Sequence, residues 1–243
     1  MRRLGWRILA TLVGFGFKLC PRQWRFPLAQ RFARVFQSLL RRTSQYTNRD
    51  TQLDGYCEEA LRLTLYTMKR LDVEYDPHIT VLGAEAIKRG SLIISLHFYL
   101  NPLFVRWLMD AGYQVSQVAA SIPDQPKYAG SQLPGDALKS DAKVFFGIRR
   151  RVAAGGVVVI YLDHPRPLNN GRIVETPVGP RYVSDAALKF AERFQIPVLF
   201  CSTRMTEQGQ IVTRVIRPSS HHAAGLLDEY CNFVSAEARQ VER

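Results

Sequence analysis

Two side chains that could move protons follow directly after apolar segments typical of buried strands. His97 comes after residues 91–96 (SLIISL), and Asp163 comes after residues 157–162 (VVVIYL). A histidine at a strand exit could take a proton from a substrate hydroxyl, and a nearby carboxylate could orient its ring. The simpler interpretations are a hydrogen-bonded structural histidine and an aspartate that starts a turn. The two residues are therefore the candidate catalytic pair, with these simpler roles left open.

The segments around this pair alternate between strand and helix patterns. Apolar runs predict strands at residues 79–82, 91–96, 113–120, 157–162, 198–202 and 211–216. Apolar residues at helical spacing predict helices at residues 51–71, 101–110, 141–154 and 184–194, and from about residue 223. This order predicts an α/β fold with a mostly parallel sheet and helices on both faces. Strand exits meet at one edge of such a sheet, where we expect His97 and Asp163.

Several other side chains could hold a charged substrate group. We predict that Asn101, Arg166 and Arg181 bind substrate. For the two arginines the reason is that guanidinium groups form charge-assisted hydrogen bonds with phosphate. Arg172 and the run Arg149-Arg150-Arg151 have the same chemistry, although charge runs are usually solvated surfaces. Asn101 followed by Pro102 also fits a helix N-cap followed by proline at the first helical position.

The sequence contains no motif for nucleotide, hydrolase or metal chemistry. It has no P-loop, no GxGxxG and no GxSxG motif. His221-His222 has no further ligand at metal-binding spacing, so we interpret it as the start of the last helix. The four cysteines are widely separated, which favours reduced thiols over a disulfide framework. We expect no metal and no bound cofactor.

The net charge of +12 is concentrated near the start of the chain. Residues 1–50 contain eleven basic residues and one acid, Asp50, a local charge of +10. The same segment holds an uncharged run at residues 9–17 (LATLVGFGF), which is apolar for a nucleic-acid-binding arm and short for a transmembrane helix. A basic and apolar segment of this kind is typical of a protein that binds an anionic membrane surface.

A helical stripe within the segment supports the same interpretation. Leu28, Phe32, Val35, Phe36 and Leu39 fall on one helical face, with arginines on the others. We predict a membrane-associated helical segment at residues 1–50 and an α/β domain at residues 51–243. The alternative is an ordinary amphipathic helix that docks on its own domain.

From residue 92 to residue 204 the chain resembles the lysophospholipid acyltransferase superfamily, in particular its late lipid A (lauroyl and myristoyl) acyltransferase branch. The similar segments are SLIISLHFYLNPLF, VVVIYLDHP and ETPVGPRYVSDAALKFAERFQIPVLFCSTR, together with the basic N-terminal segment. The resemblance implies transfer of a fatty-acyl group from an acyl carrier protein or coenzyme A thioester to a lipid or glycolipid hydroxyl. It implies His97 as general base and a bacterial enzyme at the cytoplasmic face of the inner membrane.

The chain departs from this family at one important position. The family motif is H-x-x-x-x-[DE], and Pro102 stands where the acid is expected. The orienting group would then be Asp163, Asp124 or Asn101. The alternative function is a catalytically inactive relative that binds lipid or an acyl carrier. We expect a membrane lipid and an acyl donor as partners, and no nucleic acid.

Overall fold

The computed structural model describes most of the chain. The described residues are 16–42, 61, 64–65, 68, 73–76, 78–96, 100–119, 138–139, 143–164, 171–174, 180–206 and 208–239. Four residues named above, Asp50, His97, Asp124 and Arg166, lie outside them.

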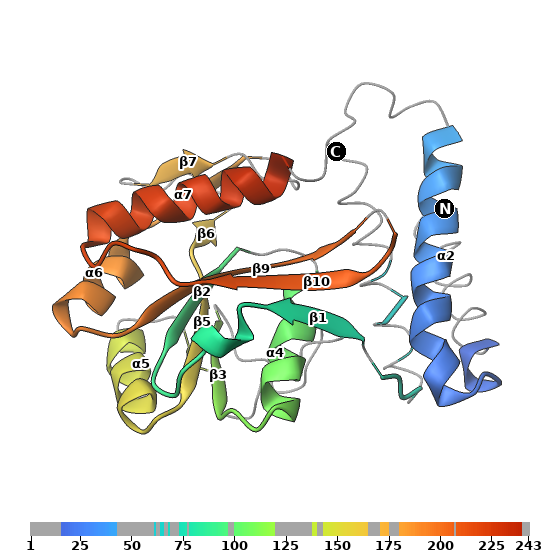
Figure 1. The fold of residues 1–243 in the computed structure, drawn as a ribbon, viewed down its shortest axis with the longest axis horizontal. Coiled ribbons are helices and arrows are strands. Elements are labelled where there is room, and N and C mark those ends of the chain that lie inside the picture. Colours follow the sequence, from blue (N-terminus) through green and yellow to red (C-terminus); the bar gives the residue numbers. More distant parts are fainter. Residues whose placement is uncertain are drawn as a thin grey trace.

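A seven-stranded sheet forms the centre of the fold (Figure 1). Its strands are β1 (Ile79–Leu82), β2 (Leu92–Ser95), β3 (Val115–Ala119), β4 (Leu138–Lys139), β5 (Val157–Tyr161), β9 (Val198–Met205) and β10 (Ile211–Ile216). Their order is β1-β10-β9-β2-β5-β3-β4. Neighbouring strands are parallel except for the antiparallel pair β9 and β10. The predicted mostly parallel sheet is confirmed.

Helices cover both faces of this sheet. They are η1 (Ala84–Ala86), α4 (Asn101–Asp110), α5 (Val144–Ala153), α6 (Ala186–Arg193) and α7 (Ala223–Arg239). On one face of the sheet, α5, α6 and α7 pack against every second residue of β2 and β5, including Ile94 and Ile160. On the other face, α4 packs against the remaining residues of the same two strands, including Ile93 and Val159. The period of two along each strand therefore divides its side chains between two apolar layers.

A second, smaller sheet was not predicted. It has the order β6-β8-β7 and is antiparallel, with β6 (Asp163–His164), β7 (Arg172–Val174) and β8 (Arg181–Val183). Figure 1 shows β7 beside α7. These strands are two or three residues long, so no periodicity can reveal them in the sequence. Asp163 therefore begins a strand of a second sheet, where the simpler interpretation expected a turn.

The helix α2 (Arg22–Arg42) packs on the α/β domain through part of its surface. Phe26, Ala29 and Ala33 are fully buried, in one cluster with Met68 and Ile211, among others. The predicted membrane stripe lies beside this face: Leu28 and Phe32 are half-buried, and Val35 is 59% exposed. Ala29 and Ala33 allow the helix to approach the domain closely. The docking face was not predicted, because two of its buried residues are small alanines and the predicted stripe consists of large apolar residues. None of the helices in the described ranges is long and apolar enough to cross a bilayer.

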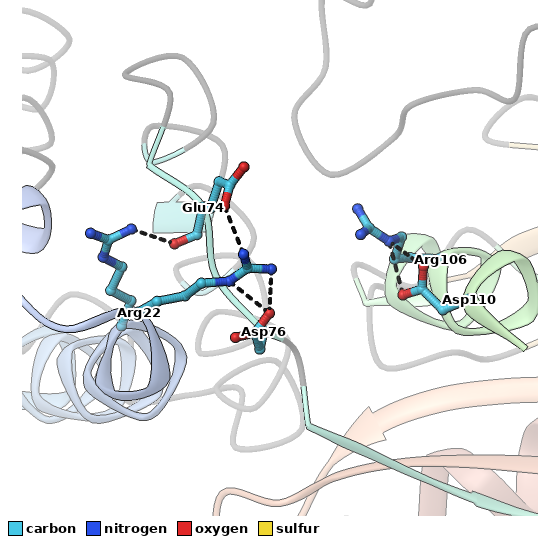
Figure 2. A network of polar contacts seen from close by, with 6 residues as sticks. Arg22, Glu74, Asp76, Arg106 and Asp110 are labelled. Atoms are coloured by element: carbon cyan, nitrogen blue, oxygen red, sulfur yellow. Dashed lines mark hydrogen bonds and ion pairs between the residues drawn. The ribbon is translucent and has the colours of Figure 1, made fainter.

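Charged side chains fix the beginning of α2. Arg22 contacts Glu74 at 2.8 Å and Asp76 at 2.7 Å, and Figure 2 shows its guanidinium between the two carboxylates. The Arg25 Nη1 donates to the Glu74 carbonyl at 2.8 Å. The side chains of these ion pairs are exposed to solvent, so they contribute little to the free energy of unfolding. Their contribution is to orient the first turn of α2 against residues 74–76. The nearby pair of Arg106 and Asp110 lies within α4.

Part of the predicted helix at residues 51–71 is described. Leu61, Thr64 and Met68 are helical and buried, as their spacing indicated, and Leu65 joins them. The other residues of that predicted face lie outside the described residues. The helix contributes to the cluster beneath α2, and the division at residue 50 stays a prediction.

Replacing Phe26 with alanine tests whether α2 is part of the folded core. We expect Phe26→Ala to lower the free energy of unfolding by about 3–5 kcal/mol, because it removes a fully buried ring. Val35→Ala, on the exposed side of the same helix, should change it by less than about 0.5 kcal/mol. Urea unfolding followed by circular dichroism measures both. Equal, small effects would mean that α2 does not dock in solution.

Candidate functional site

The carboxyl ends of the central strands meet at one edge of the sheet, here called the carboxyl edge. In the register of β2 and β5, Ser95 lies opposite Tyr161. On its other side β2 pairs with β9, which continues to Met205 beyond the end of β2. Residues that follow β2 and β5 therefore leave the sheet next to each other. This is the edge at which α/β proteins bind their ligands.

Asp163 is buried just beyond the end of β5. Its side chain is 2% exposed, and its Oδ2 lies 3.8 Å from the Nε of Arg181. The pairing of β6 with β8 brings Arg181 there, since Asp163 lies opposite Val183. Arg181 thus compensates the charge of a buried carboxylate, a role different from the predicted binding of substrate anions. At 3.8 Å the contact is an ion pair without a hydrogen bond.

The groups around Asp163 remain protonated at neutral pH. Burial raises the pKa of Tyr161 and of Tyr230, and the negative charge of Asp163 raises both further. Burial likewise raises the pKa of Cys201 to about 12. Because the thiolate is the reactive form of cysteine, Cys201 does not fit the role of nucleophile.

Asn101 occupies a different position from the one its sequence context predicted. The residue that caps α4 is Leu100, and Asn101 lies inside the helix, 2% exposed. Its Nδ2 donates to the Ser95 Oγ at 2.7 Å and also to the Leu96 carbonyl. The Ser95 hydroxyl in turn donates to the Cys201 carbonyl at 2.9 Å. The amide nitrogen therefore binds the exit of β2. The N-cap prediction is wrong, because Asn101 is the first residue of α4 and its Oδ1 accepts no backbone N–H among the described residues.

The carbonyl oxygen of the same amide has no hydrogen-bond partner among the described residues. The orientation of the amide is fixed, because the Leu96 carbonyl can only accept a hydrogen bond. A buried acceptor without a donor costs about 1–3 kcal/mol.

A second polar cluster, missed by the sequence analysis, lies on the α7 side of the same edge. The Ser202 hydroxyl donates to the Glu237 Oε2 at 2.7 Å, and Arg214 lies 3.1 Å from the Glu237 Oε1. The Arg204 Nη1 donates to the Glu237 carbonyl at 3.5 Å. Arg204 in an otherwise apolar strand was the available signal, but the predicted strand ended at Ser202. The strand β9 continues for three more residues, to Met205, and so includes Thr203 and Arg204.

The remaining sequence candidates have structural partners or lie elsewhere. Arg172 pairs with Asp228 of α7, and Arg149 stacks on Phe194 with its guanidinium 4.6 Å from the ring centroid. His222 contacts Glu192 at 2.9 Å at the start of α7, as expected for a residue that begins a helix. Within the described ranges, no three potential metal ligands lie together.

A polar groove of about 530 Å³ lies between α2, β1 and the turn from β9 to β10. Gln30, Arg34, Thr80, Gln208 and Gln210 are among the residues that line it. The turn follows the carboxyl end of β9, so the groove opens at the same edge as Asp163, on the other side of β2. The amides and the guanidinium make it suitable for a polar group.

The Glu237 cluster should contribute to stability. We expect Glu237→Ala to lower the free energy of unfolding by about 2–4 kcal/mol, since it leaves Ser202 and Arg214 without their carboxylate partner. Asp228→Ala on the same helix removes only an exposed ion pair, so the loss should stay below about 1 kcal/mol. Urea titration of both variants tests this ranking. A harmless Glu237→Ala would show that the cluster does not hold α7 on the sheet.

Neither a protein-family model nor a curated protein sequence matches this chain. The function is therefore inferred from the residues at the carboxyl edge.

Proposed function

We propose that this chain is an acyltransferase that moves a fatty-acyl group from an acyl carrier protein or coenzyme A thioester to the hydroxyl of a membrane lipid or glycolipid. His97 is the general base. The observation that carries the proposal is the buried carboxylate of Asp163, which lies one strand from the exit of β2, the strand that His97 follows. No cofactor takes part in this chemistry.

The reaction requires one base and a donor for the developing oxyanion. The neutral imidazole of His97 accepts the proton of the lipid hydroxyl, and the hydroxyl oxygen attacks the thioester carbonyl carbon. The tetrahedral oxyanion is held by main-chain N–H groups, the C–S bond breaks, and the imidazolium returns the proton to the thiolate. Asp163 stabilises the imidazolium by its charge, and Arg181 lies 3.8 Å from its Oδ2 on the side of the small sheet.

The location of α2 supports a lipid acceptor. Its buried face shares a cluster with Leu100 and Leu103, at the start of α4, so the helix lies at the carboxyl edge. Figure 1 shows α2 across the ends of β9 and β10. Its outer surface carries Trp24 and Val35, 54% and 59% exposed, beside the cation Arg31. An interface helix at this edge would present the site to the bilayer, and the polar groove could take a lipid headgroup.

The alternative is a relative without catalysis that binds lipid or an acyl carrier. The replacement of the motif acid by Pro102 favours it. The Asp163–Arg181 pair also fits this alternative, because buried ion pairs can be purely structural. Both functions require binding to a membrane surface, but only the acyltransferase requires His97.

Catalysis is tested by lipid mass spectrometry of cells that produce the protein or its variants. His97→Ala should abolish the acylated product, and Asp163→Asn should lower its formation at least tenfold. The double variant should equal His97→Ala, because Asp163 acts only through the imidazole. Asp185→Asn, which removes an acid paired with Lys189 in α6, is the matched control and should keep full activity.

The outcomes separate the two proposals. Unchanged lipids in His97→Ala cells would reject the enzyme and leave the binding relative. Loss of product only in His97→Ala, with normal Asp163→Asn activity, would remove Asp163 from the mechanism. Melting temperatures of purified variants show whether any loss reflects unfolding.

Membrane association is tested by co-sedimentation with vesicles that contain anionic or only zwitterionic lipids. The full chain should bind anionic vesicles more strongly, and salt should weaken binding without abolishing it, because apolar contacts are not screened. Replacing Trp24 and Val35 together with serine should reduce the residual binding at high salt, with the fold unchanged. Equal binding of this variant would place the membrane contact outside the described part of α2.

A further inference from the structure

We infer that the polar groove beside α2 binds the phosphate group of a lipid headgroup, held between Arg34 of the helix and the opposite wall formed by β1 and the turn after β9. The inference deepens the proposed function and rests on it for the identity of this lipid as the acyl acceptor. Binding of phosphate to the groove can be measured without any acyl transfer.

The lining of the groove has the chemistry of an anion site. Arg34 contributes a guanidinium with a permanent positive charge, and His78, Thr80 and Gln210 are exposed polar residues of the opposite wall. No carboxylate lines the groove within the part of the chain that the structure describes. A cavity of about 530 Å³ with N–H and O–H donors on both walls suits a phosphate, which has several acceptor oxygens.

The turn between β9 and β10 brings its backbone against the guanidinium of Arg34. Gly209 has a φ of +80°, and a Cβ at this residue would lie 2.5 Å from the Arg34 Cζ. One helical turn earlier, the Gln30 Nε2 donates to the Gly209 carbonyl at 2.7 Å. Glycine permits both this backbone conformation and the close contact. The two side chains of α2 therefore hold one wall of the groove in place.

Hydrogen bonds within the turn hold the opposite wall. The Gly209 N–H donates to the Thr206 carbonyl at 2.7 Å, and the Thr206 N–H donates to the Gln210 carbonyl at 2.8 Å. The Gln210 N–H also donates to the Thr206 Oγ1 at 3.2 Å. In the parallel pair of β1 and β10, Ile79 lies opposite Ile211, so the start of β1 runs beside the turn. A groove built on fixed backbone loses little conformational freedom when a ligand binds.

The two acids that precede β1 are bound at the beginning of α2. Glu74 and Asp76 contact Arg22 at 2.8 Å and 2.7 Å (Figure 2). Arg34 follows Arg22 by more than three helical turns, about 18 Å along the axis. These two carboxylates therefore compensate the charge of Arg22 and not that of Arg34.

The surroundings of the groove favour a lipid over a free anion. Val35 is next to Arg34 in the sequence and is 59% exposed, on the surface of α2 that we propose to contact the bilayer. An interface helix lies at the depth of the lipid headgroups, where phosphate groups are concentrated. The guanidinium and the apolar contact thus lie next to each other on one helix, as phosphate and acyl chains do in a lipid.

The groove lies away from the end of β2. Cys201 of β9 accepts from Ser95 at that end, and β9 continues to Met205, about 13 Å further. Ile211, which lines the groove, lies opposite Met205. The bound phosphate is therefore a part of the acceptor remote from the reacting hydroxyl. Its contacts are the same in the ground state and the transition state, so their loss should raise KM for the acceptor and leave kcat little changed.

The experiment titrates the full-length protein with water-soluble probes and follows the backbone amide signals of Gly209 and Gln210 by ¹H–¹⁵N NMR. The probes are inorganic phosphate, dihexanoyl-phosphatidylglycerol and dihexanoylglycerol. The phosphorylated lipid should shift both signals and bind about tenfold or more tightly than inorganic phosphate, because its chains add apolar contacts. Dihexanoylglycerol, which lacks the phosphate, should leave the signals in place.

Three variants test the residues of the groove. Arg34→Gln should weaken binding of the phosphorylated lipid about tenfold or more, because it removes the charge-assisted hydrogen bonds. Arg31→Gln removes the same charge from an exposed position on the same helix, and as the matched control it should change the affinity less than about twofold. Gln210→Ala keeps the backbone bonds of the turn and should weaken binding about threefold.

No shift at Gly209 and Gln210, or equal affinities of the Arg34→Gln and Arg31→Gln proteins, would overturn the inference. Should Arg34→Gln fail to fold, Gln210→Ala decides, and an unchanged affinity would overturn it. Inorganic phosphate that binds as tightly as the phosphorylated lipid would reject the lipid as the ligand. Lipid binding that depends on Arg34, in a protein whose His97→Ala variant leaves cellular lipids unchanged, would support the inference and reject the proposed enzyme. Acyl transfer that needs His97 but has the same KM in Arg34→Gln would do the reverse.

Discussion

The carboxyl edge depends on the placement of β2 between two parallel partners. Hydrogen bonds tie β2 to β5 on one side and to β9 on the other, and its four residues are buried. A shift of β2 by one residue would exchange the side chains of its two faces and separate Ser95 from the Cys201 carbonyl. The register of this one strand therefore fixes which residues meet where the strands end.

Polar groups at this edge are buried, and each is compensated differently. Asp163 has a guanidinium nearby, Glu237 accepts from a hydroxyl and faces an arginine, and Asn101 binds a hydroxyl and a carbonyl. Burial of these polar side chains without such partners would lower the free energy of unfolding. Buried polar groups at the ends of strands are typical of sites built on α/β sheets.

The helix α2 links the edge to the surface of the molecule. Its small buried residues pack against the start of α4, and its larger apolar residues remain partly exposed. One helix can thus dock on the domain with one face and contact a bilayer with another. The predicted alternatives of domain docking and membrane contact are compatible, because Phe26 and Val35 lie on different faces.

The sequence by itself determined the elements whose signals are local. The run VVVIYL, the spacing of Leu61, Thr64 and Met68, and the helix before Gly155-Gly156 depend on residues within one element, so strand, helix and boundary could be read directly. The alternation of these elements also predicted the parallel sheet. A candidate edge followed from that sheet, with Asp163 beside the end of β5.

Only the tertiary structure decided which side chains meet there. Arg181 reaches Asp163 through the pairing of two strands too short to show a period, and Ser202 reaches Glu237 across 35 positions of the chain. The local pattern at Asn101-Pro102 predicted a helix cap. In the structure the Asn101 Nδ2 instead donates to the Ser95 Oγ and the Leu96 carbonyl. Such contacts arise from strand register and helix packing between distant segments, and their energies do not appear in local periodicity or propensity.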